Sequence, residues 1–492
     1  MEKINPIYKS ILILTLIFSL FVSFQYLQLR YNLCYSFSPD MRGQEKNVVY
    51  GIQQTMTGLQ NLYKSIDKPP FAFIQYTPIY YWLCANICNS LELKPGQNLI
   101  EIYRTSRLVN LGLNLLSCLL LFYILNNLLG VHWMLTLLAC NIFLISTQSH
   151  TWSIRPDALK NVIFLGSVLL FLLWRKTELK LFGVLSALAV GLAIFTKQDM
   201  VALPIAFLIF LVIYSEKKEW FTYFGWLSIV AIILISLFTL IYGFSIWQNL
   251  YWAVNNGSSL ANAKGIIVGY FGTYIYFIPL GVFTTFYWLS HKSLVQEKFL
   301  AILTLVLFVF GCLATSKSGS LIAYFNETNT AILLSITFFI SSYIKQNETI
   351  VLFASCLSFG IIFQEMSAYK PEMDRLKGGE IENSEESHYK DVKSLETYFR
   401  QIKNKNKVIY SNDPFVKNML FAHVILPMDD IVFFNMKAGT FDPKPYQDFY
   451  QSRKIDFAIF KDSEPHQDIL GQQFDNFIPI KTVGRFTLYK KN

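Results

Sequence analysis

Four polar segments of the sequence combine carboxylates and cations in patterns that could do chemistry. The first holds Asp40 and Glu45, in the stretch SPDMRGQEKNVVY. A carboxylate partly shielded from water has a raised proton affinity, so either acid could act as a general base. The alternative interpretation is an ordinary solvated loop with charges of both signs.

The second segment places Arg155, Asp157 and Lys160 at the start of an apolar run. Local capping explains Pro156 and Asp157, because proline and an acid suit the first turn of a helix. It does not explain the two cations, which stand where a helix N-terminus already attracts anions. We therefore predict a phosphate-binding role for Arg155 and Lys160.

The third segment is the short polar break FTKQD, with Lys197, Gln198 and Asp199, between two apolar runs. Charges at such depth usually face a cavity or a partner, although a Lys197–Asp199 pair that caps a tight turn would also explain them. The fourth segment is a Ser/Gly-rich loop with Lys317, followed by Glu327 at the start of an apolar run. Here a polar loop with a carboxylate at a helix N-terminus is an equally good explanation.

Composition places these segments in a membrane protein. Of 492 residues, 53% are hydrophobic and only 15% are charged, well below the roughly 25% of soluble domains. The net charge of +9 is spread between apolar runs rather than clustered, so no nucleic-acid partner is expected. The seven cysteines lie mostly in apolar runs, and we interpret them as small hydrophobic residues.

Apolar runs long enough to approach a membrane span predict about eleven transmembrane helices. The first is too long for a cleavable signal and should remain as an anchor. Loops on the N-terminal side hold about twice as many Lys and Arg residues as the short loops opposite, so the N-terminus is expected inside and the C-terminal region outside. The runs centre near residues 11–29, 108–129, 131–149, 158–174, 181–196, 200–214, 222–243, 266–290, 299–315, 329–344 and 349–366.

Two regions should stand outside the bilayer. Residues 31–107 form a long first outer loop, in which Val48, Ile52, Met56 and Leu59 predict an amphipathic helix. Within it, Phe71–Leu91 is apolar enough to span marginally, which would invert every later loop. Its tyrosines and Pro78 instead favour a helix that lies in the interface.

The tail predicts a small extracytoplasmic α/β domain over residues 371–492, after a membrane domain over residues 1–370. No G-x-G-x-x-G fingerprint occurs in the chain. The tail alternates short apolar stretches with turns. Expected strands fall within 407–414, 429–436, 454–462 and 484–491, and expected helices near 390–404 and 445–453.

The order of several short motifs resembles a known family. The motifs are Asp40, Glu45 and Tyr50; Pro69-Pro70; Tyr76-Thr77-Pro78-Ile79-Tyr80-Tyr81; Arg107-Leu108-Val109; Arg155-Pro156-Asp157-Ala158-Leu159; and Gly191-Leu192-Ala193-Ile194-Phe195-Thr196-Lys197-Gln198. Over roughly residues 10–345 the chain resembles the polyprenyl-phosphate-sugar-dependent glycosyltransferases of the GT-C fold, in the branch of protein O-mannosyltransferases and aminoarabinose transferases. The resemblance implies an all-α polytopic GT-C membrane protein with interfacial helices in the first outer loop.

The resemblance also implies a mechanism. An acid of the first loop, Asp40 or Glu45, would deprotonate an acceptor hydroxyl, which attacks the anomeric carbon with inversion while polyprenyl phosphate leaves. The position of Glu45 before Tyr50 favours it slightly, although many relatives have adjacent acids where this chain separates them. Cations would hold the donor phosphate, and further polar side chains would line the substrate site. The phosphate ligands are expected to be Arg155, Lys160, Lys197 and Lys317, and the substrate-binding residues Tyr50, Tyr76, Tyr80, Asp157, Gln198 and Glu327.

Other functions fit parts of the pattern. A lipid-linked glycan flippase or polymerase would share the hydrophobicity and outer cations, and a non-catalytic relative would only bind an acceptor. The expected partners of a transferase are a polyprenyl-phosphate-linked sugar, a glycan, lipid or protein acceptor, and the bilayer of a bacterial plasma membrane with the catalytic face outside. Some GT-C enzymes use a divalent metal, but the sequence shows no clear ligand set and no metal ligands are assigned.

Overall fold

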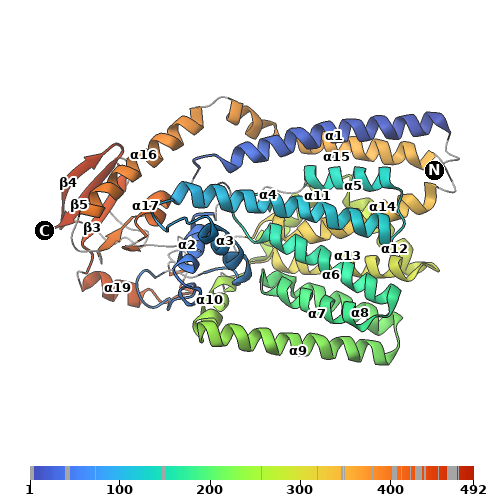
Figure 1. The fold of residues 1–492 in the computed structure, drawn as a ribbon, viewed down its shortest axis with the longest axis horizontal. Coiled ribbons are helices and arrows are strands. Elements are labelled where there is room, and N and C mark those ends of the chain that lie inside the picture. The colour runs from blue at the N-terminus through green and yellow to red at the C-terminus, as the bar shows by residue number, and fades with distance from the viewer. Residues whose placement is uncertain are drawn as a thin grey trace.

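A bundle of helices carries a small sheet at one end, opposite the N-terminus (Figure 1). The structure is a computed structural model. It describes residues 5–38, 41, 45–71, 74–146, 151–255, 257–317, 320–344, 347, 349–377, 380–401, 407–411, 413–421, 423–426, 435–436, 439–452, 454–461, 474 and 476–492.

Within the described residues, six helices are long and apolar enough to cross a membrane, and a seventh crossing arises if a pair bent by 94° counts as one span. The six are α1 (Pro6–Cys34), α4 (Leu99–Tyr123) with its π-helical extension Ile124–Leu128, α6 (Asp157–Thr177), α9 (Lys217–Tyr242), α13 (Val295–Ala314) and the first part of α15 (Thr349–Lys377). The bent pair is α11 (Leu260–Thr273) and α12 (Ile278–Ser290). The protein is therefore an integral membrane protein that crosses the bilayer several times.

Shorter helices complete the bundle. They are α5 (Trp133–Ser146), α7 (Lys180–Ile194), α8 (Ala202–Tyr214), which follows the 3₁₀ turn η4 (Gln198–Val201), and α14 (Asn326–Ile344), which follows the 3₁₀ turn η5 (Ile322–Phe325). Within the described residues, each apolar run predicted from the sequence is mostly helical, although the run over 266–290 is broken between α11 and α12. The count of eleven crossings is not confirmed, because several of these helices are shorter than a span requires.

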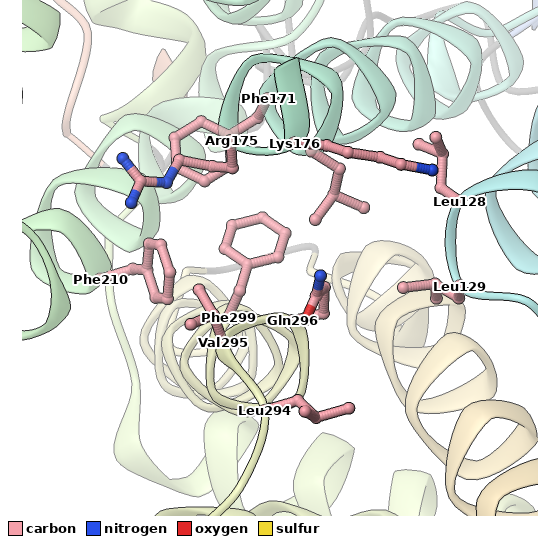
Figure 2. A pocket seen from close by; sticks show the side chains of 11 residues that line it. Leu128, Leu129, Phe171, Arg175, Lys176, Phe210, Leu294, Val295, Gln296 and Phe299 are labelled. Atoms are coloured by element: carbon pink, nitrogen blue, oxygen red, sulfur yellow. The ribbon is translucent and has the colours of Figure 1, made fainter. Parts of the chain in front are cut away.

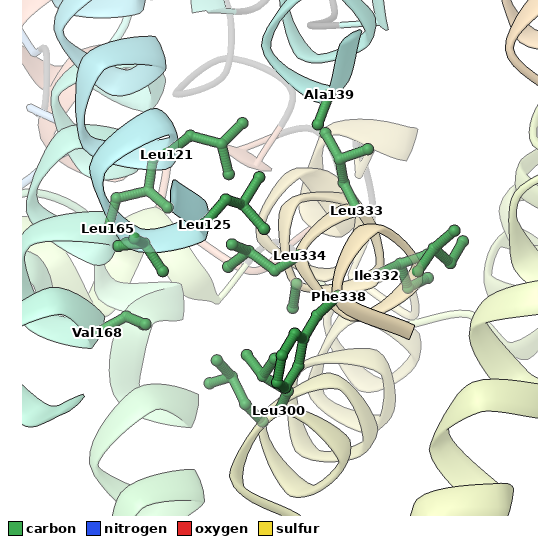
Figure 3. Packing of buried hydrophobic residues seen from close by; sticks show 14 of the residues in the cluster. Leu121, Leu125, Ala139, Leu165, Val168, Leu300, Ile332, Leu333, Leu334 and Phe338 are labelled. Atoms are coloured by element: carbon green, nitrogen blue, oxygen red, sulfur yellow. The ribbon is translucent and has the colours of Figure 1, made fainter. Parts of the chain in front are cut away.

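The outer faces of the long helices are apolar, as a bilayer requires. On α9, Leu240 is 85% exposed and Ile232 is 65% exposed. The interior is apolar as well: Figure 3 shows Leu121 and Leu125 of the α4 segment facing Leu165 of α6 and Leu334 of α14. Since lipid tails drive no helix association by themselves, this close interior packing holds the bundle together.

Local sequence signals fix both ends of α6. Pro156 precedes its first residue, Asp157 occupies the first turn, and Arg175 and Lys176 occupy the last turn. These charges complement the helix dipole at each end. At about 1.5 Å per residue, Asp157 and Arg175 lie about 27 Å apart along the axis, which is close to the thickness of the hydrocarbon core.

The first loop forms two short helices, α2 (Glu45–Met56) and α3 (Ile79–Ser90), near the sheet end of the bundle (Figure 1). The predicted amphipathic helix is confirmed as far as Met56, with Val48 and Ile52 buried, but Leu59 lies beyond it in a 3₁₀ turn and is 40% exposed. Helix α3 has 12 residues, too few to span a bilayer, and it packs on α2 and α4. A further short helix, α10 (Ser245–Val254), follows α9.

The C-terminal unit, residues 380–492, contains a five-stranded sheet of order β2-β1-β3-β5-β4. β1 pairs in parallel with β2 and β3, whereas β5 is antiparallel to β3 and β4. The elements are α16 (Glu380–Gln401), β1 (Val408–Tyr410), α17 (Pro414–Met419), β2 (Val424–Leu426), α19 (Lys444–Gln451), β3 (Phe457–Lys461), β4 (Phe477–Val483) and β5 (Phe486–Lys491).

The sequence predicted most of this unit. Strands β1, β3 and β5 and both expected helices are confirmed, while β2 and β4 were not expected. The strand expected over 429–436 falls largely outside the described residues, and its last two residues are helical. The domain boundary at 370 remains a prediction.

Candidate active site

Glu45, the first residue of α2, forms an ion pair with Arg107 of α4. The distance from Arg107 Nη2 to Glu45 Oε2 is 2.6 Å, and neither side chain is exposed. Arg107 Nε donates to Glu45 Oε1 as well, at 3.2 Å, which makes the pair bidentate. A buried pair of this kind needs further hydrogen bonds to offset the loss of hydration.

Those further bonds hold the segment that contains Asp40. Arg107 donates to the carbonyl oxygens of Ser36, at 2.8 Å, and Ser38, at 2.6 Å. Glu45 Oε2 accepts from the backbone N–H of Met41 at 2.9 Å. Asp40 itself lies outside the described residues, but in the chain it stands between these two anchored points.

The same carboxylate reaches a distant loop. Glu45 Oε1 accepts from the backbone N–H of Ile154 at 2.7 Å. Asn114 of α4 holds this loop by donating to the Thr151 carbonyl at 2.9 Å, and Asn110 by donating to the Arg155 carbonyl at 3.2 Å. The acid of the first loop is therefore bonded to the residue directly before Arg155.

Asp157 is the centre of a set of ion pairs at the start of α6. Its carboxylate lies 2.8 Å from Lys197 Nζ, 3.3 Å from Arg155 Nε and 3.8 Å from Lys160 Nζ. The side chain of Asp157 is fully buried. Three cations around one carboxylate leave excess positive charge, which further acids must balance.

Lys160 supplies the link to those acids. Its Nζ lies 2.9 Å from Asp199 Oδ2 and 3.0 Å from Glu327 Oε2, with no exposed surface. We call Arg155, Asp157, Lys160, Lys197, Asp199 and Glu327 the ionic cluster. It balances three cations against three carboxylates. Because Lys160 is enclosed, it holds the cluster together and does not face solvent.

Lys197 lies nearer the surface of the cluster. Its Nζ is 5.1 Å from the centre of the Tyr324 ring. Burial favours the neutral amine, but Asp157 and Asp199 outweigh it and raise the pKa of Lys197 well above its usual value. Lys197 is therefore charged at any physiological pH. Tyr76 is also among the groups that act on it.

Lys317 adds a positive charge that the ionic cluster does not balance. Among the described residues no carboxylate lies within ion-pair distance of its Nζ, which donates to the carbonyl oxygen of Ala253. Burial, assisted by the positive charge of Lys197, lowers the pKa of Lys317 to about 8. An anion bound here would relieve both effects.

Apart from Asp40 and Glu45 of the first loop, the predicted site residues divide into three groups. The ionic cluster gathers Arg155, Asp157, Lys160, Lys197 and Glu327, with Lys317 and Tyr76 close enough to act on its charges.

The second group forms hydrogen bonds with other residues next to the cluster. Tyr80 donates to Asn110 at 3.0 Å, and Gln198 donates to the Gln75 carbonyl at 3.0 Å. Tyr50 stands apart: it bonds Gln54, and its ring lies 5.7 Å from that of Phe421 in the C-terminal unit.

Several residues have roles that the sequence did not assign to them. Arg107, Asn110 and Asn114 hold the two loops, and the Tyr324 ring lies beside Lys197. Asp199, which the sequence singled out together with a possible Lys197 pair, lies 3.5 Å from Lys197 Nζ and also pairs with Lys160. A signal was present for three of them: a cation and two amides at positions 107, 110 and 114 share one face of an apolar helix. Polar groups in such a helix usually have partners in the protein interior.

In the part of the chain that the structure describes, no group of three or more His, Cys, Asp or Glu side chains is arranged to hold a metal ion. The carboxylates of Asp157, Asp199 and Glu327 are each paired with a lysine. The described residues thus gather ammonium and guanidinium groups with carboxylates at one place.

Solved structures share this architecture. ArnT from Cupriavidus metallidurans bound to undecaprenyl phosphate superposes with a TM-score of 0.60 and 11% identity, over 97% of both chains. The oligosaccharyltransferase AglB from Archaeoglobus fulgidus, in complex with an inhibitory peptide and a dolichol-phosphate, gives a TM-score of 0.57 at 9% identity, over 90% of this chain and 69% of that chain.

The chain has the GT-C fold. The expectation drawn from the sequence motifs is confirmed at this level, and these two neighbours are bound to undecaprenyl phosphate and to a dolichol-phosphate. No protein-family model and no curated protein sequence matches the chain.

Proposed function

We propose that this protein is a glycosyltransferase that moves a sugar from a polyprenyl-phosphate donor to an acceptor hydroxyl, with inversion, on the extracytoplasmic side of a bacterial plasma membrane. The observation that carries the proposal is the hydrogen bond from the Ile154 N–H to Glu45. It brings the acidic first loop to the cations at the start of α6, as a site with a base and an anion-binding group requires.

The phosphate of the donor would bind at Arg155, Lys197 and Lys317. Arg155 and Lys197 lie at the edge of the ionic cluster, 7% and 5% exposed, and Lys317 supplies the surplus positive charge. As the bond to the sugar breaks, negative charge grows on the leaving phosphate. Charge-assisted hydrogen bonds from fixed cations stabilise that charge without reorganisation.

Asp40 is the better candidate for the base. Each carboxylate oxygen of Glu45 accepts two hydrogen bonds, and its side chain has no exposed surface. This favours Asp40 as the group that takes the acceptor proton and Glu45 as the residue that positions its segment, which reverses the order suggested by the sequence. Asp157, Glu327, Tyr76 and Gln198 would line the site around the donor.

The C-terminal unit would help to bind the acceptor. Gln53 of α2 donates to Asn418 Oδ1 of the unit at 3.0 Å, and Asn418 donates to the Lys46 carbonyl at 3.0 Å. These bonds join the unit to the helix that begins with Glu45. An acceptor held by the unit would therefore approach the site from the first loop.

The proposal is tested by mass spectrometry of cell-envelope glycans in a strain that lacks this gene. We expect one glycosyl modification to disappear and to return with the native protein. Asp40→Ala with Glu45→Ala should fail to restore it, while Asp67→Asn, a first-loop acid with an exposed side chain, should restore it. Full restoration by the double variant would show that neither acid is the catalytic base.

A further inference from the structure

A second binding feature lies at the end of the bundle opposite to the ionic cluster. It is a cavity of about 290 Å³ between α4, α6, α8 and α13 (Figure 2). It is lined by Leu128, Leu129, Phe171, Leu172, Arg175, Lys176, Phe210, Leu294, Val295, Gln296 and Phe299.

The position of the cavity along the membrane normal separates it from the proposed transfer site. Arg175 stands in the last turn of α6 and Asp157 in the first turn, about 27 Å apart at 1.5 Å per residue. That distance is about the thickness of the hydrocarbon core, so the cavity opens at the other membrane boundary. It therefore cannot hold the phosphate that reacts at the ionic cluster.

The floor of the cavity is apolar and aromatic. The rings of Phe171 and Phe299 stack at a centroid distance of 4.8 Å, and Phe210 meets Phe299 edge-on at 5.2 Å. Figure 2 shows the Phe299 ring directed into the space below α6. Such a surface binds hydrocarbon and offers little to a free inorganic anion.

Two cations flank this apolar floor. In Figure 2 the side chains of Arg175 and Lys176 extend from α6 in opposite directions along the cavity. Arg175 Nη1 pairs with Glu219 at 2.6 Å, but its Nε is buried and has no hydrogen-bond partner among the described residues. Lys176 forms no ion pair within that part of the chain. The other nearby acid, Glu297, accepts from the Leu294 N–H at 2.7 Å.

We propose that this cavity is a binding site for an anionic phospholipid of the surrounding bilayer. One acyl chain would lie against Phe171, Phe210 and Phe299, and the phosphodiester would lie beside Lys176, with Arg175 at the other end of the cavity. Basic pockets between transmembrane helices bind anionic headgroups in this way, on the side of the membrane where lysine and arginine accumulate. A zwitterionic lipid would bring no net negative charge to Lys176, which forms no ion pair among the described residues.

Native mass spectrometry of the full-length protein, titrated in detergent with phosphatidylglycerol or phosphatidylcholine, tests this site. Near a membrane surface each cation strengthens anionic-lipid binding by about fivefold. Lys176→Gln, which removes no ion pair of the described structure, should weaken phosphatidylglycerol binding by about fivefold. Arg175→Gln with Lys176→Gln should weaken it by more than tenfold.

The matched control is Lys180→Gln, which removes the same charge from the start of α7 without touching the cavity. It should bind phosphatidylglycerol as the native protein does. Val295→Trp should also reduce binding, because it fills the cavity without changing its charge. The proposal is overturned if Lys180→Gln and Lys176→Gln lose affinity equally, if phosphatidylcholine binds as tightly as phosphatidylglycerol, or if millimolar inorganic phosphate displaces the lipid.

Discussion

Glu45 and Ile154 lie 109 positions apart in the chain, yet a hydrogen bond of 2.7 Å joins the carboxylate of one to the backbone N–H of the other. The same carboxylate is paired with Arg107, which in turn holds the backbone at Ser36 and Ser38. One buried pair thus fixes the entry of the first loop and the approach to Arg155 together. The placement of acid and cations at one end of the bundle follows from it.

The two acids of the first loop should fail in different ways when neutralised. Glu45→Gln leaves the Arg107 guanidinium buried without a negative partner, which typically costs about 3–5 kcal/mol. We expect a lower unfolding temperature together with lost activity. Asp40→Asn should keep the native unfolding temperature and reduce turnover by about a hundredfold or more, as expected for a general base.

Thermal unfolding in detergent and the glycan assay separate these outcomes, with Asp67→Asn as the first-loop control. A stable and active Glu45→Gln protein would contradict the positioning role. If Asp40→Asn is active, Glu45 and not Asp40 is the candidate general base.

The lowered pKa of Lys317 predicts that kcat/KM for the donor depends on pH. With its pKa lowered to about 8 by burial and by Lys197, it is protonated below pH 8 and neutral above. Since a phosphate donor needs the charged form, kcat/KM for the donor should fall as pH rises through about 8, by up to tenfold per pH unit. Lys317→Arg should remove this decline, because the guanidinium stays charged.

The control for this profile is Lys264→Gln, a charge change on an exposed lysine of α11. It should keep the native decline above pH 8. If Lys317→Arg shows the same decline, the titrating group is not Lys317.

Lys160 should behave as a structural residue. It is fully buried between Asp199 and Glu327, so Lys160→Met removes the cation that pairs with Glu327 and leaves Asp199 with Lys197 alone. A loss of about 3–5 kcal/mol in stability is expected, measured as reduced yield and a lower unfolding temperature. Adding Glu327→Leu to Lys160→Met should recover part of it. A native-like Lys160→Met protein with weakened donor binding would instead place Lys160 among the phosphate ligands.

Gly51 is required by the packing of α2 on α3. A Cβ atom added at this position would lie 2.5 Å from Cε1 of the buried Tyr81 ring. Gly51→Ala should therefore cost about 1–3 kcal/mol of stability and displace the helix that begins with Glu45. Gly166→Ala in α6 is the matched control, since no atom lies within 4 Å of its added Cβ, and it should be neutral or stabilising. Equal unfolding temperatures for the two variants would contradict this packing.

Local patterns in the sequence were enough to locate the helices of the bundle and of the first loop. Apolar runs predicted the bundle helices, and the spacing of Val48 and Ile52 predicted α2, because both signals depend on a few neighbouring residues. Arg155, Asp157 and Lys197 were found because charges in apolar surroundings need partners.

The hydrogen bonds and ion pairs between distant residues could not be predicted from the sequence. Nothing near position 45 indicates that Arg107 and Ile154 will occupy both oxygens of its carboxylate. Lys160 was expected to bind phosphate, but its enclosure by Asp199 and Glu327 depends on how α6, η4 and α14 meet. Tyr50 was placed at the site by its motif, whereas its ring packs on Phe421 of the C-terminal unit.

Binding of undecaprenyl phosphate to the purified protein tests the phosphate site most directly. Removing the surplus charge with Lys317→Gln should weaken binding by about tenfold, roughly 1.4 kcal/mol. Lys264→Gln, an equal charge change on an exposed helix face, should leave it unchanged. Equal affinities for the native protein and Lys317→Gln, or an equal loss in both variants, would contradict the account.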